Sequence, residues 1–195
     1  GSEAPPAGGG WATYLVAPAQ PMRLDYWGRW VFGDPNWDYR TFDWDHDLAY
    51  AEERLKIVDS TDAELREFRW SGGKLLMYAG WADAVVPPGD TVEYFEALRR
   101  AAGSADAVGE YARLFMAPGM AHCRGGTGPD SFDALSALVR WVEEGVAPDE
   151  LIAAKVVDGD VQRTRPLCPY PQVARYTGTG STDAAENFRC VLTED

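Results

Sequence analysis

Gly72-Gly-Lys-Leu-Leu-Met-Tyr-Ala-Gly80 and Tyr111-Ala-Arg-Leu-Phe-Met-Ala117 give the strongest structural signal in this chain of 195 residues. Each is a short, continuous apolar run, and glycines bound the first. Such runs are typical of strands buried on both faces of a parallel sheet. The apolar spacing of residues 91–102 and 131–145 predicts a helix after each strand. Strand, helix, strand, helix is the pattern of an α/β fold.

The regions on either side give weaker signals. Aromatic residues crowd the stretch from Trp11 to Trp44, interleaved with Gly, Pro and Asp, which predicts irregular structure with short helical turns. Residues 47–60 have the apolar spacing of an amphipathic helix, with Asp45 or Asp47 as its cap. The stretch from Val146 onward predicts a polar, turn-rich extension.

Composition excludes several classes of function. The formal net charge is −13, and 46% of the residues are apolar, which indicates a globular chain with a large acidic excess. Such a charge opposes binding to nucleic acid or to an anionic membrane surface. No run approaches the ~18 apolar residues that a membrane-spanning helix needs. Nothing in the sequence indicates a cofactor.

An acid and a base follow the two predicted strands. Asp83 lies in Gly80-Trp-Ala-Asp83, and His122 lies in Pro118-Gly-Met-Ala-His122. Neighbouring parallel strands would bring both side chains to one rim of the sheet. In α/β-hydrolases the triad follows the order Ser, Asp, His, because a carboxylate must orient the imidazole that takes the nucleophile's proton. Taken singly, each residue is more often a turn or structural residue.

Six motifs occur in order along the chain: Asp34-Pro-Asn-Trp37, Gly80-Trp-Ala-Asp83 with Pro87-Pro88, Arg113 to Cys123, Trp141 to Pro148, Arg163 to Pro171 and Gly178 to Cys190. Together these motifs resemble the tannase and feruloyl esterase family. The resemblance covers nearly the whole sequence and implies an α/β-hydrolase core with an inserted lid, acting on esters of aromatic acids.

The resemblance implies a role for individual residues. Asp83 matches the triad acid and His122 the general base. Cys168 and Cys190 match a family disulfide, and Cys123 matches a cysteine that pairs with one beside the nucleophilic serine. The disulfides favour a secreted or periplasmic protein. The resemblance also divides the chain into residues 1–70, the end of the aromatic-rich lid, and 71–195, the C-terminal part of the hydrolase core.

The nucleophile is the main departure from the family. Neither its Cys-Ser-x-Gly-Gly motif nor a Gly-x-Ser-x-Gly elbow occurs in these 195 residues. We therefore expect the serine, and the cysteine that pairs with Cys123, in an N-terminal portion of the same protein, and the chain alone to be inactive. The family's lid calcium site also falls outside this stretch, so no metal ligands are assigned here.

Other interpretations remain open. A non-catalytic hydrolase-like module could bind a polyphenol or carbohydrate. A non-ester hydrolase with Cys123 as its nucleophile is a further alternative, but Cys123 directly adjoins His122 in sequence and is therefore a poor nucleophile for that base. Trp81 could contact substrate. The alternating acids of residues 43–47 suggest a calcium loop, but capping explains them better because the loop glycine and distal Glu are lacking. Four rings could line an acyl pocket or simply pack in a core: Trp27, Trp30, Trp37 and Trp44.

Overall fold

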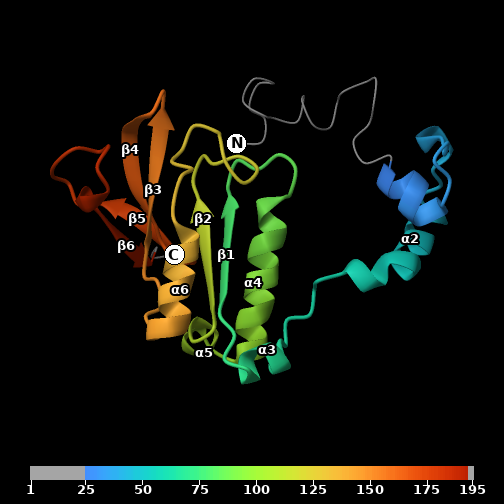
Figure 1. The fold of residues 1–195 in the computed structure, drawn as a ribbon, viewed down its shortest axis with the longest axis horizontal. Helices are drawn as coiled ribbons and strands as arrows, with labels where there is room; N and C mark the ends of the chain where they lie inside the picture. Colours follow the sequence, from blue (N-terminus) through green and yellow to red (C-terminus); the bar gives the residue numbers. More distant parts are fainter. Residues whose placement is uncertain (1–24, 193–195) are drawn as a thin grey trace.

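The computed structural model describes residues 25–192 as a mixed α/β structure (Figure 1). The α-helices are α2 (Asp47–Leu55), α3 (Arg66–Trp70), α4 (Pro88–Ala102), α5 (Ala105–Gly109) and α6 (Ala134–Glu144). A π-helix, η2, spans Tyr26–Phe32, and short 3-10 turns are η3 (Tyr39–Thr41), η4 (Lys56–Val58) and η5 (Ala185–Asn187). The strands are β1 (Leu75–Gly80), β2 (Ala112–Ala117), β3 (Leu151–Val157), β4 (Asp160–Leu167), β5 (Gln172–Tyr176) and β6 (Phe188–Leu192).

The two predicted strands form a parallel pair at the centre of the molecule. β1 pairs with β2 in a register that runs from Leu75 opposite Ala112 to Gly80 opposite Ala117. The side chains of β2 alternate between two apolar clusters. One cluster includes Leu114 with residues of α4, and the other includes Phe115 with residues that lead into α6. This confirms the α/β prediction, and Figure 1 shows α4 and α6 flanking the pair.

Local sequence explains the ends of the flanking helices. α4 begins at Pro88, whose missing N–H costs nothing in the first turn, and ends at Gly103, whose φ of 88° suits glycine. The Asp133 carboxylate accepts the Ser136 N–H and caps α6, which ends at Gly145. α4 begins three residues before the predicted range, and α6 three residues inside it.

The expectation of a merely turn-rich tail after Val146 was wrong. The tail forms two antiparallel hairpins, β3–β4 and β5–β6. Asp158-Gly159 closes the first hairpin with positive φ at both residues, as a tight two-residue turn requires. Successive side chains of β3 point to opposite faces, so Leu151 and Ala153 are buried but Ile152 is exposed. The strand therefore gives only a weak hydrophobic signal in the sequence.

The tail is fixed to the core in two ways. The Tyr170 N–H donates to the Leu114 carbonyl at 2.7 Å, and Phe115 bridges Pro169, so the tail occupies the edge of β2 that faces away from β1. A disulfide joins Cys168 to Cys190 across 22 positions. Closing a loop of this length contributes about 3 kcal/mol by a chain-entropy argument.

The aromatic segment packs mainly on itself. Trp27 contacts Phe42, and Trp37 stacks on Phe32, with ring centroids 4.8 and 5.0 Å apart. Trp30 and Trp44 are instead exposed. Figure 1 shows this segment well away from the loops that follow β1 and β2. The division of the chain at residue 70 stays a prediction, and the sequence before residue 25 lies outside the described residues.

We expect Phe115→Ala to lower the free energy of unfolding by about 3 to 5 kcal/mol, because it removes a fully buried ring between the sheet and the tail. Chemical denaturation followed by circular dichroism measures the change. Leu135→Ala, at an exposed position of α6, is the matched control and should change stability by about 0.5 kcal/mol or less. Equal effects of the two substitutions would contradict the central position of Phe115.

Candidate active site

Asp83 lies in the turn that ends β1. Its N–H donates to the Gly80 carbonyl at 3.1 Å, which closes the turn immediately after the strand. The side chain is buried, with 8% of its surface exposed. One carboxylate oxygen, Oδ1, accepts the N–H groups of Val85 and Val86 at 2.8 and 3.0 Å. The backbone therefore fixes the orientation of this carboxylate before any other side chain contributes.

Gly80 allows the loops after β1 and β2 to cross closely. A β-carbon at position 80 would overlap the carbonyl oxygen of Met120, so only glycine fits there. The crossing is held by two backbone bonds, from the Ala82 N–H to Met120 O and from the Trp81 N–H to Ala117 O, both 3.0 Å. This close approach brings the residues that follow Gly80 beside the loop that contains His122.

Asp83 and His122 meet within hydrogen-bonding distance although 39 positions separate them. His122 Nδ1 lies 2.8 Å from Asp83 Oδ2, the oxygen that the backbone leaves free. An ionised carboxylate is acceptor-only, so we assign the proton to Nδ1, and Nε2 remains as the acceptor of the ring. The imidazole is 43% exposed, while the carboxylate is buried. The arrangement presents an oriented base to solvent.

The pKa of Asp83 lies below its ordinary value of 3.8. Burial alone would raise this pKa, but the Val86 N–H, the His122 ring and the Val85 N–H together outweigh it by stabilising the charged form. The carboxylate is therefore ionised at neutral pH, which is the state that can stabilise an imidazolium.

A partly buried ion pair holds the loop on which His122 lies. Asp130 Oδ2 accepts the Gly125 N–H at 2.6 Å, while Oδ1 lies 3.1 Å from Lys155 Nζ. The same ammonium donates to the Gly126 carbonyl at 2.8 Å. Lys155 belongs to β3, so these bonds connect the loop that contains His122 to the C-terminal tail. Neither residue was identified from the sequence, where a lone Asp and a lone Lys give no signal.

We expect Asp130→Ala to lower the free energy of unfolding by about 1 to 3 kcal/mol, because a partly buried ammonium loses its carboxylate partner and the Gly125 N–H loses its acceptor. Faster hydrogen exchange at the Gly125 amide should accompany the loss. Denaturation and amide exchange measure both effects. Asp183→Ala breaks an exposed pair with Arg163 and should cost about 1 kcal/mol or less. An unchanged Gly125 exchange rate would contradict the role of Asp130 in holding this loop.

Trp81 and Cys123 are close in sequence to Asp83 and His122, but within residues 25–192 neither forms a hydrogen bond with that pair. Trp81 is 46% exposed and lines a cavity of about 490 Å³ between the sheet and the tail. Asp83 and His122 are not among the residues that line this cavity, so a substrate-binding role of Trp81 stays a prediction. Cys123 is exposed, has a φ of 63° and forms no disulfide within residues 25–192.

The acidic stretch before α2 forms hydrogen bonds with its own backbone. Asp43 Oδ1 accepts the N–H groups of Asp45 and His46, and Asp47 Oδ2 accepts the Asp43 N–H. These bonds order the turn that leads into α2, but the N-cap residue of the helix is His46, which makes no side-chain capping bond, so the predicted cap by Asp45 or Asp47 was wrong. Within residues 25–192 no group of three or more His, Cys, Asp or Glu side chains is placed to hold a metal ion.

Comparison with known proteins adds independent evidence. A family model described as "Tannase and feruloyl esterase" matches residues 30–191. An uncharacterised esterase of Xanthomonas campestris is 36% identical over 82% of this chain and 34% of its own length. Mono(2-hydroxyethyl) terephthalate hydrolase of Piscinibacter sakaiensis is 48% identical over 75% of this chain and 24% of its own length. The crystal structure of feruloyl esterase B from Aspergillus oryzae superposes with a TM-score of 0.79 at 30% identity, covering 92% of this chain and 39% of that one.

The parallel strand pair flanked by helices and the superposition on feruloyl esterase B indicate part of an α/β-hydrolase-like fold. Within that class, the chain belongs to the tannase and feruloyl esterase family. It spans 34% and 24% of the two curated relatives described above.

Proposed function

We propose that the complete protein hydrolyses carboxylic esters of aromatic acids through an acyl-enzyme, with His122 as general base and Asp83 as the carboxylate that orients it. One observation supports this assignment above all others: the 2.8 Å contact between His122 Nδ1 and the buried Asp83 carboxylate. A binding module would have no need for an ionised carboxylate aimed at an imidazole. The names of the relatives, an esterase and a terephthalate monoester hydrolase, support the same reaction class.

In the proposed reaction His122 Nε2 takes the proton of a serine hydroxyl as its oxygen attacks the ester carbonyl. Asp83 stabilises the resulting imidazolium through Nδ1–H. The imidazolium then gives its proton to the departing alcohol, leaving an acyl-serine. Water attacks this acyl group with His122 again as base, and the serine regains its proton as the carboxylic acid leaves.

The proposed nucleophile is a serine on a segment outside these 195 residues. The sequence has no nucleophile elbow, and the chain spans only 24% and 34% of its curated relatives. Within residues 25–192, β1 pairs on one edge only, whereas the tail already occupies the far edge of β2. The open edge of β1 is where a preceding part of the sheet would add, and Cys123 would pair with a cysteine of that part.

Hydrolysis by the complete protein and by this chain alone tests the proposal. Both are assayed with a p-nitrophenyl ester and a gallate ester, and we expect turnover only by the complete protein. Mass spectrometry after labelling with a serine-directed phosphonate then locates the nucleophile, which we expect outside these 195 residues. Turnover by the isolated chain, or a phosphonate on one of its serines, would contradict the assignment.

The same protein is proposed to be secreted or periplasmic. The Cys168–Cys190 disulfide supports this, because such bonds persist in oxidising compartments. In the described part of the chain, no helix has the length and apolar character needed to cross a bilayer. The proposed partners are a small aromatic ester and the N-terminal portion of the protein. We propose neither a cofactor in this chain nor binding to nucleic acid or membranes, and a lid calcium site would lie outside it.

A further inference from the structure

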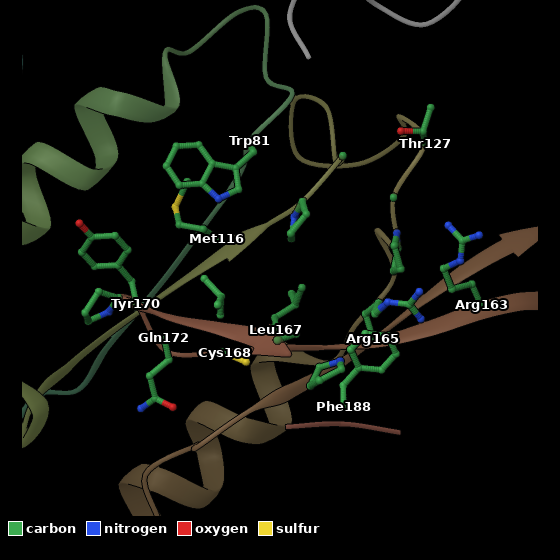
Figure 2. Close-up of a pocket in the computed structure, with 18 residues that line it drawn as sticks. Trp81, Met116, Thr127, Arg163, Arg165, Leu167, Cys168, Tyr170, Gln172 and Phe188 are labelled. Carbon is green, nitrogen blue, oxygen red and sulfur yellow. The ribbon is translucent and has the colours of Figure 1, made fainter. Parts of the chain in front are cut away.

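The cavity between the sheet and the tail has one wall that is polar and cationic. It measures about 490 Å³, and its lining includes Trp81, Met116, Thr127, Arg163, Arg165 and Phe188. Figure 2 shows Trp81, Met116 and Tyr170 grouped on one side, with Thr127 and the two arginines on the other. This volume is within the range of pockets that hold small organic ligands, about 300 to 1,000 Å³.

The two arginines differ in their ionic partners. Arg163 Nε lies 2.6 Å from Asp183, so its charge is already paired. Arg165 has no salt bridge among the described residues. Its NH1 donates to the Thr164 carbonyl at 2.7 Å, and its guanidinium lies 4.1 Å from the centroid of the Phe188 ring. Arg165 therefore keeps donors available for an anion.

The surroundings of Arg165 would strengthen its contact with an anion. The residue is partly buried, and burial, with a smaller effect from the Arg163 charge, lowers its pKa, while Asp183 acts in the opposite direction. A guanidinium remains charged despite such a shift. Because the guanidinium is partly removed from water, a carboxylate would gain more here than at an open surface.

The other wall favours a flat apolar body. Trp81 and Tyr170 contribute aromatic rings, and Met116 contributes a polarisable thioether next to the Trp81 side chain. Thioethers and aromatic rings both pack well against aromatic groups, so this wall suits the ring of a ligand. A ligand that spans the cavity would place a ring against this wall and a negative group at Arg165.

We propose that this cavity binds a small aromatic carboxylate, with its ring beside Trp81 and Met116 and its carboxylate on Arg165. The site is separate from the Asp83–His122 pair, neither of which lines the cavity. The proposal does not rest on the proposed function, because it follows from the charge and shape of the cavity alone.

Isothermal titration of the complete protein with benzoate tests the site, with benzamide as the neutral analogue. We expect benzoate to bind and benzamide to bind at least tenfold more weakly. Arg165→Met should weaken benzoate binding by roughly tenfold or more, the loss of a charge-assisted hydrogen bond. Arg175→Met, on the exposed side of β5, is the matched control and should leave binding unchanged.

Thermal melting of each variant confirms that it is folded, and Arg165→Gln provides a second removal of the charge should the Met variant unfold. Absence of benzoate binding, or equal binding by wild type and both Arg165 variants, would overturn the proposal. So would a crystal structure of the complete protein in which another part of the chain fills the cavity. Because calorimetry requires no turnover, loss of this site is distinguishable from failure of the esterase proposal.

Discussion

His122→Ala in the complete protein is expected to lower kcat for ester hydrolysis by about 10⁴-fold or more, with a much smaller change in KM. Without the imidazole, nothing takes the proton from the nucleophile or returns one to the leaving alcohol, and the remaining rate comes from substrate binding and electrostatic stabilisation. Steady-state kinetics with a chromogenic aromatic ester measure the effect. The free energy of unfolding should fall by about 1 to 3 kcal/mol, because the buried Asp83 oxygen that faces the ring loses its partner.

The second histidine offers a close control. His46 Nδ1 also lies 2.8 Å from a carboxylate oxygen, that of Asp47, but this pair is at the exposed start of α2. His46→Ala should therefore leave kcat within about twofold. If both variants retained activity, or both lost it equally, the assignment of His122 as the base would fail.

Asp83→Asn is expected to lower kcat by about 10⁴-fold while keeping the loop geometry. The amide oxygen can still accept the Val85 and Val86 N–H groups, but its NH₂ faces His122 Nδ1. That contact favours the tautomer with a proton on Nε2, so the ring can no longer accept one there. Kinetics on the same ester measure the loss, and Asp47→Asn, which alters the exposed histidine pair, is the control. A variant within tenfold of wild type would exclude Asp83 from the triad.

The same substitution should change the acid stability of the protein. Because the folded-state pKa of Asp83 is below 3.8, its ionised form stabilises the fold above that pH, and this contribution is lost as the pH falls through the folded-state value. Asp83→Asn lacks the contribution at every pH, so the stability difference from wild type should shrink as the pH falls below 3.8. Urea denaturation across this pH range measures the stability difference, and a difference that stays constant with pH would contradict the lowered pKa of Asp83.

The parallel core could be predicted from sequence because its apolar runs are compatible with only one environment. Apolar runs such as residues 75–80 and 112–117 need burial on both faces, and the strand-end loops then place Asp83 and His122 at one rim. The β3–β4 hairpin also has a local sequence signal, because Asp158-Gly159 is a favoured pair for a two-residue hairpin turn. Short strands with single buried positions do not stand out by hydrophobicity.

Other features could not be inferred from local pattern. The Asp130–Lys155 pair joins residues 25 positions apart whose proximity depends on how the tail folds over the loop. The available charge of Arg165 likewise becomes visible only when Asp183 is seen beside Arg163. In both cases the sequence shows the charged residues, but tertiary structure decides which of them pair.

The register that aligns Gly80 with Ala117 has a consequence for how such a protein can change. Acid and base are placed by strand pairing and by the crossing at Met120, and not by the length of the connection that contains α4 and α5. That connection can therefore lengthen, shorten or exchange its surface while the proton-transfer geometry is inherited intact. Catalytic spacing and peripheral variation are thus separable in this architecture.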